Sequence, residues 1–463
     1  MKRLLASALC VLAACGDDAS PGVDAAVSPD GASPDASSSG SVSELLARRL
    51  TGDRTGACVE AALIRGDSVE TGFACAGEPR AIEGSAFEIG SISKTMTGFL
   101  LTDLVRRGAI SLDDPIADHL GVDVVRWEEQ PLLVRHLLTH TSGLPALPPG
   151  FAPTNPANPY AHLTADGLLA TLSDAPLASA PGETWSYSNY AFMVLSHVVA
   201  QKHEGAFVDA LSGRMLNPNG FAETFVETPP AGVSLVQGHR SNGLDASPWT
   251  IAPTLSGLGM VRSTLNDMIR YARLAMGEGD PESVAVMAQA MEPLGLPARG
   301  PQVMASAWIV VPLPDRTLYA HGGGTGGFSS FVAVDRESRE AVVLLSDTAL
   351  SDVGGFEEVA LHLLAPERIP LPAPRLPETA PETIVASLAG DYDLRGTSLT
   401  LFAQDGELRA SVGGETLRFG YDSYGDFYGL EIDALLRPVE LPDGRTTFEW
   451  RQGGGVLLAE RAR

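Results

Sequence analysis

Two apolar segments with a tight turn between them open the folded part of the chain. Residues 58–65 and 68–75 are rich in Val, Ile, Ala and Phe, and Gly66-Asp67 separates them. A Gly-Asp pair between two such segments favours a two-residue β-turn. We therefore expect an antiparallel hairpin here, preceded by a helix that ends near residue 50.

From Ser91 onwards the apolar residues follow the spacing of a helix. They recur at intervals of three and four, and Gly108 is placed to end the pattern. The apolar face of this expected helix comprises Met96, Phe99, Leu100, Leu104 and Val105.

The region from 110 to 300 predicts helices and long loops, including a proline-rich loop over 144–160. Strand patterns then return in four segments, SAWIVVPL, TLYAHG, FSSFVAV and AVVLLSD, and a helix is expected over 355–364. Strands therefore open and close one domain, and a helical body is inserted between them.

The C-terminal part predicts a separate β domain. Residues 365–382 hold six prolines, which favour a stiff linker over 366–382. Beyond it, short alternating segments are separated by turn pairs such as Asp405-Gly406 and Asp443-Gly444. We expect a small all-β domain of barrel type over 383–463, and it offers no pairing of a nucleophile with a base.

The first 42 residues predict export and a tether. The segment MKRLLASALCVLAAC has a basic start, an apolar run too short to span a bilayer and small residues before Cys15. Its end resembles the bacterial lipoprotein cleavage box. We expect a lipoprotein signal peptide over 1–14, lipidation of Cys15, and anchoring to a bacterial membrane facing the periplasm or the exterior. An ordinary secretory signal cut near Ala14 is the alternative. Residues 15–42 predict a disordered tether.

The charge of the chain limits its partners and isolates one residue. The formal charge is −25, which argues against a nucleic-acid partner because such a partner needs a basic face. Of the 32 Lys and Arg residues only Lys2, Lys94 and Lys202 are lysines. A lysine at the start of the helix predicted from Ser91 therefore needs an explanation.

Two cysteines fall within the expected hairpin. A turn at Gly66-Asp67 brings together positions whose numbers sum to 133, and Cys58 and Cys75 satisfy this. Counting from the turn makes them a non-hydrogen-bonded pair, with Cα atoms about 4.5 Å apart, within reach of a disulfide. An exported protein permits the bond. The alternative is two small buried thiols.

The pair Ser91 and Lys94 is the first candidate for chemistry. Residues three apart share a helix face, so the serine hydroxyl and the lysine amine can meet. In the first turn the backbone N–H of Ser91 is also free to bind an anion. A nucleophile, an amine and an oxyanion donor would then share one turn. The alternative is a helix cap and a surface lysine.

Two further motifs follow along the chain. Tyr187-Ser188-Asn189 precedes an apolar helical run; a phenol can relay a proton and an amide can orient a substrate carbonyl. The alternative is a core aromatic and a capping asparagine. His321 ends a strand before three glycines, whose backbone could admit a substrate and complete an oxyanion hole. The alternative is a glycine-rich loop with an incidental histidine.

Together, in this order, Ser91-x-x-Lys94, Tyr187-x-Asn189 and His321-Gly322-Gly323 resemble the three motifs of the serine β-lactamase and penicillin-binding-protein superfamily. The tyrosine resembles the class C branch, as do LLTHTSGLP and GLGMVRSTLNDMIRYA. The resemblance covers roughly residues 45–365. It implies an α+β fold, an α/β/α sandwich with an antiparallel sheet flanked by helices and the site beside an inserted helical subdomain.

The resemblance also implies residue roles. Ser91 would be the acylated nucleophile, Lys94 its base partner and Tyr187 the proton relay. Asn189 would contact a substrate amide, and His321 would take the position of the third-motif cation. The N–H groups of Ser91 and Gly324 would form the oxyanion hole, with Gly322 and Gly323 beside the substrate.

The third motif departs from the Lys-Thr-Gly of many β-lactamases, since it lacks both the permanent charge and the hydroxyl. This argues against strong carboxylate recognition and efficient β-lactam hydrolysis. We expect a serine hydrolase that acts through an acyl-enzyme on esters, D-amino-acid peptides or amides, or β-lactams. A non-hydrolysing lipoprotein that binds cell-wall peptides or penicillin is the alternative. No cofactor or metal motif occurs, and the expected partners are a small-molecule or short-peptide substrate and a membrane.

Overall fold

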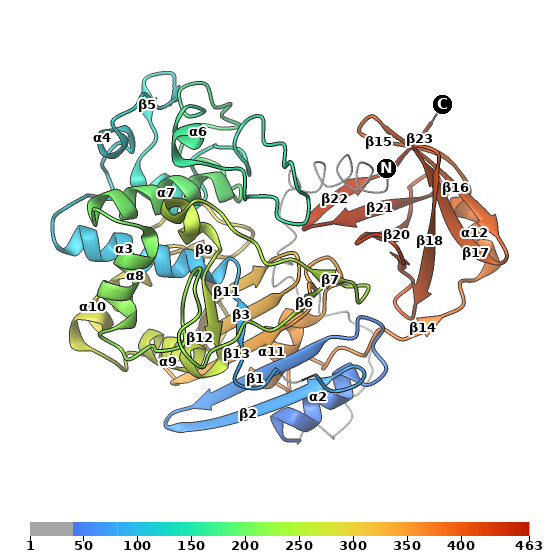
Figure 1. The fold of residues 1–463 in the computed structure, drawn as a ribbon, viewed down its shortest axis with the longest axis horizontal. Helices are drawn as coiled ribbons and strands as arrows, with labels where there is room; N and C mark the ends of the chain where they lie inside the picture. The colour runs from blue at the N-terminus through green and yellow to red at the C-terminus, as the bar shows by residue number, and fades with distance from the viewer. Residues whose placement is uncertain (1–39, 81, 463) are drawn as a thin grey trace.

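The computed structural model describes residues 40–80 and 82–462, which form a larger α+β body and a smaller β body beside it (Figure 1). The expected signal peptide over 1–14, the lipid site Cys15 and nearly all of the expected tether lie outside the described residues. Both bodies have a hydrophobic core of their own.

The larger body is built on a seven-stranded antiparallel sheet in the order β2-β1-β13-β12-β11-β10-β9. Strands open and close the domain, as the sequence predicted, and the two ends meet in this sheet because β1 pairs with β13. The strands are β1 (Cys58–Arg65), β2 (Ser68–Cys75), β9 (Val303–Met304), β10 (Ile309–Pro312), β11 (Thr317–Gly324), β12 (Ser329–Asp335) and β13 (Glu340–Ser346).

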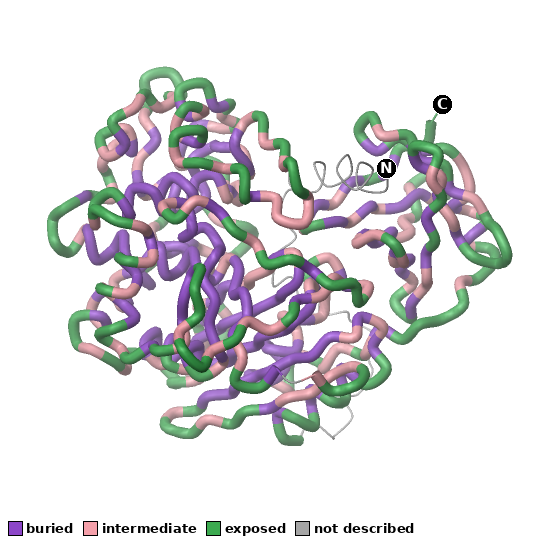
Figure 2. Tube along the Cα trace, in the orientation of Figure 1, coloured by how far each residue is buried: buried purple, intermediate pink, exposed green. Residues whose placement is uncertain are grey.

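Helices cover both faces of this sheet, and the buried strands are visible in Figure 2. Along β1, Ala61 and Leu63 pack with α2 (Val42–Leu50) and α11 (Phe356–Leu364). Ala62 and Ile64 point the other way, into the core shared with α3 (Ile92–Arg106) and α9 (Leu265–Ala275). Because successive strand residues point to opposite faces, this alternation produces an α/β/α sandwich and confirms the expected fold class.

The inserted helical body covers one end of the sheet, and α3 packs there against α7 (Asn189–Lys202) (Figure 1). Within the described residues no helix is long and apolar enough to cross a bilayer. The other elements of this part are α4 (Ala117–Leu120), α5 (Val134–Leu138), α6 (Ala165–Leu169), α8 (Phe207–Leu211), η1 (Ser212–Leu216), η2 (Pro253–Leu258) and α10 (Pro281–Ala290), and the short strand pairs β3 (Ala86–Glu88) with β8 (Arg262–Thr264), β4 (Arg126–Trp127) with β5 (Gln130–Pro131), and β6 (Gly238–His239) with β7 (Asp245–Ala246).

The hairpin formed by β1 and β2 has the register that the sequence predicted. Cys58 lies opposite Cys75 across the two strands. The structure joins the two residues in a disulfide, with Cα atoms 4.0 Å apart.

The smaller body is a near-barrel of antiparallel strands around a core that includes Tyr392, Phe448 and Trp450. The order β22-β21-β20-β19-β18-β17-β16-β15-β23 follows the chain except at β23, as expected for an all-β domain. Its elements are β14 (Pro377–Glu378), α12 (Glu382–Leu388), β15 (Gly390–Leu394), β16 (Thr397–Gln404), β17 (Glu407–Val412), β18 (Glu415–Asp422), β19 (Phe427–Gly429), β20 (Leu435–Glu440), β21 (Thr446–Gln452), β22 (Gly455–Leu458) and β23 (Glu460–Arg461).

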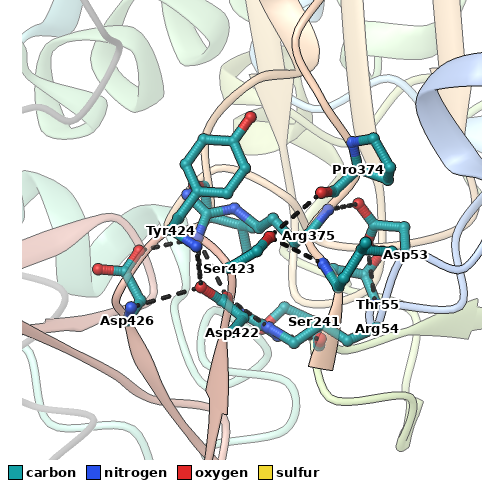
Figure 3. Close-up of polar contacts among 12 residues, drawn as sticks. Asp53, Arg54, Thr55, Ser241, Pro374, Arg375, Asp422, Ser423, Tyr424 and Asp426 are labelled. Carbon is teal, nitrogen blue, oxygen red and sulfur yellow. Dashed lines mark hydrogen bonds and ion pairs between the residues drawn. The ribbon is translucent and has the colours of Figure 1, made fainter. Parts of the chain in front are cut away.

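Buried ion pairs fasten the two bodies together (Figure 3). Arg375 donates to Asp422 and, at 2.8 Å, to Asp426 of the β domain, while its backbone N–H donates to Asp53 of the larger body. Arg54 of the larger body donates to Asp422 at 2.7 Å. The proline-rich linker therefore does more than separate two domains, because Arg375 within it is buried at their junction.

Candidate active site

Ser91 occupies the position that the Ser-x-x-Lys pattern predicted. It is the N-cap residue of α3, yet its hydroxyl makes no capping hydrogen bond to this helix. The Oγ atom instead lies 2.8 Å from Lys94 Nζ and 2.8 Å from the Tyr187 hydroxyl. These contacts place a hydroxyl between an amine and a phenol, an arrangement that can activate a nucleophile.

Lys94 is fully buried one helical turn after the serine. Its Nζ donates to Ser91 Oγ and, at 2.6 Å, to the carbonyl oxygen of Leu258, the last residue of η2. The surface lysine considered from the sequence is thereby excluded. Leu258 was not singled out from the sequence, because a backbone carbonyl leaves no trace in side-chain patterns.

Tyr187 and Asn189 lie at the start of α7. The helix is capped by Ser188, whose Oγ accepts from the backbone N–H of Ala191 at 3.0 Å. Asn189 is therefore not the capping residue, and it lines the cavity that contains Ser91. Tyr187 also lines this cavity, and its hydroxyl donates to Ser91 Oγ.

The glycines after His321 bring strand β11 against the segment that carries the serine. A Cβ atom at Gly323 would lie 2.1 Å from the Ile89 carbonyl oxygen, and one at Gly90 would lie 2.6 Å from Gly324 N. Gly90 also has φ +49°, which disfavours other residues. These close approaches require glycine and put the Gly324 backbone beside Gly90, the residue before Ser91. The oxyanion hole formed by the N–H groups of Ser91 and Gly324 stays a prediction.

His321 requires a correction, since the resemblance gave it the position of the third-motif cation among the substrate-binding residues. Its side chain is buried, and the described cavity lining includes Gly322, Gly323 and Gly324 but not His321. Burial and the charge of Lys94 lower its pKa to about 4, although a hydrogen bond to the Gly322 carbonyl acts in the opposite direction. The imidazole is therefore neutral near pH 7, and the third motif supplies no cation.

His140 is the residue that sequence reasoning missed, although the segment LLTHTSGLP containing it was noticed. It is buried, and its ring stacks on Tyr187 with centroids 4.3 Å apart. Its Nδ1 accepts from the backbone N–H of Ser188 at 3.0 Å. Burial, Lys94 and His321 lower its pKa well below the usual 6.5. Nothing in this segment of the sequence shows that the histidine contacts Tyr187 and Ser188, which lie about 47 residues further along the chain.

A cavity of about 400 Å³ contains Ser91 and is lined by both bodies of the molecule. The β domain contributes Gly454, whose N–H donates to Asp352 of the larger body at 2.9 Å. Burial and the charge of Asp433 raise the pKa of Asp352 to about 7. Among the described residues, one cationic and six acidic side chains line the cavity: Arg240, Asp352, Glu357, Glu358, Glu415, Glu431 and Asp433.

The described part of the chain holds no group of three or more His, Cys, Asp or Glu side chains arranged for a metal ion. The chemistry that the site can perform with its own groups is proton transfer and nucleophilic attack by Ser91. An acyl group transferred to Ser91 would lie beside Asn189 and the glycines of β11.

Comparison with known proteins agrees with this geometry. The β-lactamase family model matches residues 43–365. The chain is 27% identical over 266 residues to the D-alanyl-D-alanine-carboxypeptidase/endopeptidase AmpH of Escherichia coli K12, covering 54% of this chain and 68% of that protein. It is 24% identical over 377 residues to penicillin-binding protein 4* of Bacillus subtilis, covering 74% and 80%.

Solved structures share the fold. A class C β-lactamase from Rhodobacter sphaeroides superposes with a TM-score of 0.55 at 21% identity, covering 67% of this chain and 95% of that one. The octameric penicillin-binding protein homologue from Pyrococcus abyssi gives a TM-score of 0.57 at 18% identity and covers 90% of this chain and 98% of that one. With the family match extending over most of the chain, this protein belongs to the β-lactamase family and is a serine hydrolase of that family.

Proposed function

We propose that this hydrolase works through an acyl-enzyme on Ser91, with Lys94 and Tyr187 moving the protons. The observation that supports this most strongly is that Ser91 Oγ lies 2.8 Å from both Lys94 Nζ and the Tyr187 hydroxyl. Two groups able to exchange protons with one hydroxyl can deprotonate it and later protonate the leaving group.

The proposed reaction has two steps. The Ser91 proton passes to Lys94 while Oγ bonds to the substrate carbonyl carbon, and the N–H groups of Ser91 and Gly324 stabilise the oxyanion. The bond from that carbon to the leaving oxygen or nitrogen then breaks, Tyr187 delivers its proton to the leaving group, and the proton taken from Ser91 passes from Lys94 to Tyr187. In the second step water attacks the ester carbon: its hydroxyl bonds to the acyl carbon, the bond to Ser91 Oγ breaks, the other water proton passes to Oγ, and the acid is released.

We propose esters and D-amino-acid peptides or amides as the substrates, with β-lactams as poorer ones. A neutral His321 and a lining of six acidic side chains against one cationic side chain both disfavour a carboxylate on the substrate. The similarity to a D-alanyl-D-alanine-carboxypeptidase/endopeptidase and to a penicillin-binding protein supports the peptide class in general.

A substrate panel and a covalent probe test this proposal. We expect p-nitrophenyl esters and D-amino-acid amides to have a higher kcat/KM than the β-lactam nitrocefin. A phosphonate should add one adduct to Ser91, detected by intact-mass analysis and peptide mapping, and Ser91→Ala should abolish it. An adduct that persists in Ser91→Ala would refute the assignment, and acylation without turnover would favour a penicillin-binding role.

We further propose that the mature protein begins at a lipidated Cys15 and is held at a bacterial membrane. The support is the first 15 residues alone, with their basic start, apolar run and small residues before the cysteine. Mass spectrometry of the N-terminal peptide should find Cys15 carrying acyl chains, and Cys15→Ser should release the protein from the membrane fraction. An unmodified N-terminus near residue 15 would instead indicate an ordinary secretory signal.

A further inference from the structure

His140 has a backbone conformation that needs support from its surroundings. It follows α5 with φ +58°, in the left-handed region that few residues other than glycine adopt, although histidine is among the more tolerant types. Its side chain is almost completely buried, with 1% exposed. A strained and buried residue next to a reactive site indicates a positional role, if its contacts lead to that site.

The contacts of His140 lead to three consecutive residues around the predicted proton relay. Ser186 N–H donates to the His140 carbonyl at 2.8 Å, and Ser188 N–H donates to His140 Nδ1 at 3.0 Å. Between them, the Tyr187 ring stacks on the imidazole with an interplanar angle of 29°. The backbone on both sides of Tyr187 and its side chain are thus held by one residue.

We propose that His140 is a positioning residue that holds the Tyr187 hydroxyl within hydrogen-bond distance of Ser91. It acts through Tyr187, since the described cavity lining includes Tyr187 but not His140. This inference rests on the proposed acyl-enzyme function for its kinetic consequence. Its structural consequence, a Ser186–Ser188 backbone fixed by His140, can be measured without any activity.

The chemistry of the site explains why a histidine is suited to this position. To accept from Ser188 N–H, Nδ1 must be unprotonated, so the neutral ring carries its proton on Nε2. Lys94 and His321 are the titratable groups that act on it, and both disfavour its protonation; Trp185 and Phe192 lie against the ring as aromatic neighbours. A phenylalanine at this position would keep an aromatic ring to stack on Tyr187 but would have no acceptor for Ser188 N–H. An asparagine would keep an acceptor and would tolerate φ +58°, but it would have no ring.

A double-mutant cycle with Tyr187→Phe tests the inference. Single-turnover acylation by a neutral p-nitrophenyl ester should slow about 30-fold in His140→Phe and about fivefold in His140→Asn, with ester affinity within twofold of wild type. In the Tyr187→Phe background, adding His140→Phe should slow acylation by less than a further twofold, because the effects of two residues that act through one another are not additive. Losses that multiply, or a normal rate in His140→Phe, would overturn the proposal.

His136→Phe is the matched control. His136 is also buried, and its Nδ1 also accepts a backbone N–H, but from Leu133 rather than from the Tyr187 segment. We expect this variant to lower the thermal midpoint while leaving the acylation rate of folded enzyme within twofold. A loss like that of His140→Phe would show that any damage to this helix end slows acylation, and would overturn a specific role.

Amide hydrogen exchange separates failure of this inference from failure of the proposed function. In folded protein the Ser188 amide should exchange at least tenfold faster in His140→Phe than in wild type, and near the wild-type rate in His140→Asn. If wild type forms no acyl-enzyme, the proposed function fails and the exchange result still decides the positioning. Equal protection in both variants would overturn the inference even in an active enzyme.

Discussion

Two buried basic side chains in this molecule differ in their partners. Lys94 donates to the Ser91 hydroxyl and to the Leu258 carbonyl, both neutral oxygens. Arg375 at the domain junction donates to the carboxylates of Asp422 and Asp426 and to the Val353 carbonyl, and its side chain stacks on Tyr424 (Figure 3). Both side chains are buried, so the difference lies in the partners rather than in the exposure.

The difference follows from what each charge must do. An arginine does not release its proton in proteins, and its planar group can serve several carboxylates at once. The charges and hydrogen bonds of Arg437 and Arg375 in turn hold the pKa of Asp426 below its usual value, although burial alone would raise it. A base partner for Ser91 must instead give up a proton, and lysine can do so. The proposed base role would explain why a chain with three lysines among its 32 Lys and Arg residues places one of them beside Ser91.

Lys94→Arg is the strongest test of this comparison. The change keeps the positive charge but removes a group that can become neutral, so we expect acylation by a p-nitrophenyl ester to slow by about four orders of magnitude or more, equivalent to about 5.5 kcal/mol in the barrier. Stopped-flow kinetics measures this, after circular dichroism has shown that the variant is folded.

Lys202→Arg is its matched control, because Lys202 ends α7 at an exposed position. The same exchange there should leave acylation unchanged. A folded Lys94→Arg that acylates within about tenfold of wild type would mean that Lys94 supplies only a positive field, and the contrast with Arg375 would disappear.

Substitutions of Arg375 at the domain junction should change stability. Arg375→Ala leaves the buried carboxylates of Asp422 and Asp426 with one partner fewer, and we expect the free energy of unfolding in urea to fall by about 3–5 kcal/mol. Arg375→Lys keeps the charge but loses the planar group, so it should cost less than the alanine variant. A lysine variant as unstable as the alanine variant would show that hydrogen-bond geometry, rather than charge, holds this junction. Arg445→Ala, at an exposed pair with Asp443, should leave the unfolding midpoint unchanged.

The sequence predicted what local spacing controls. Ser91 and Lys94 meet because they are three residues apart on a helix, and Cys58 faces Cys75 because the turn fixes the hairpin register. It could not predict what depends on distant packing. The burial of His321 comes from the elements around β11, and the role of Arg375 inside a proline-rich segment depends on carboxylates about 50 residues further along the chain.

The contribution of the β domain to the cavity was also beyond the sequence. Asp352 and Gly454 lie 102 residues apart, and neither belongs to a motif. Likewise nothing in the letters LLTHTSGLP shows that His140 has a positive φ or that its Nδ1 faces the Ser188 amide. Motifs identify the groups that react; the residues that hold them or surround them come from tertiary structure.

The last prediction concerns the pH dependence of stability that follows from a neutral His321 beside Lys94. The folded pKa of His321, about 4, is below the usual 6.5, so between these values the unfolded chain binds a proton that the folded protein excludes. Stability must therefore fall as the pH falls through this window and must not depend on His321 above it. At pH 4.5 the expected cost is about 2.5 kcal/mol relative to pH 7.

Urea unfolding of wild type and His321→Gln at pH 7 and pH 4.5 isolates this effect, because the other titrating groups are common to both proteins. Wild type should lose about 2.5 kcal/mol more than the variant on acidification, and parallel losses would show that His321 is not held neutral.

The neutrality of His321 also has a kinetic consequence. Between pH 6 and pH 8, kcat/KM for a carboxylate-bearing ester and for a neutral ester should vary in the same way, because His321 carries no charge to lose. If kcat/KM fell selectively for the carboxylate substrate as the pH rises through neutrality, the third motif would instead carry a titrating cation. Ser91 would then have a second basic group near it that is charged at low pH.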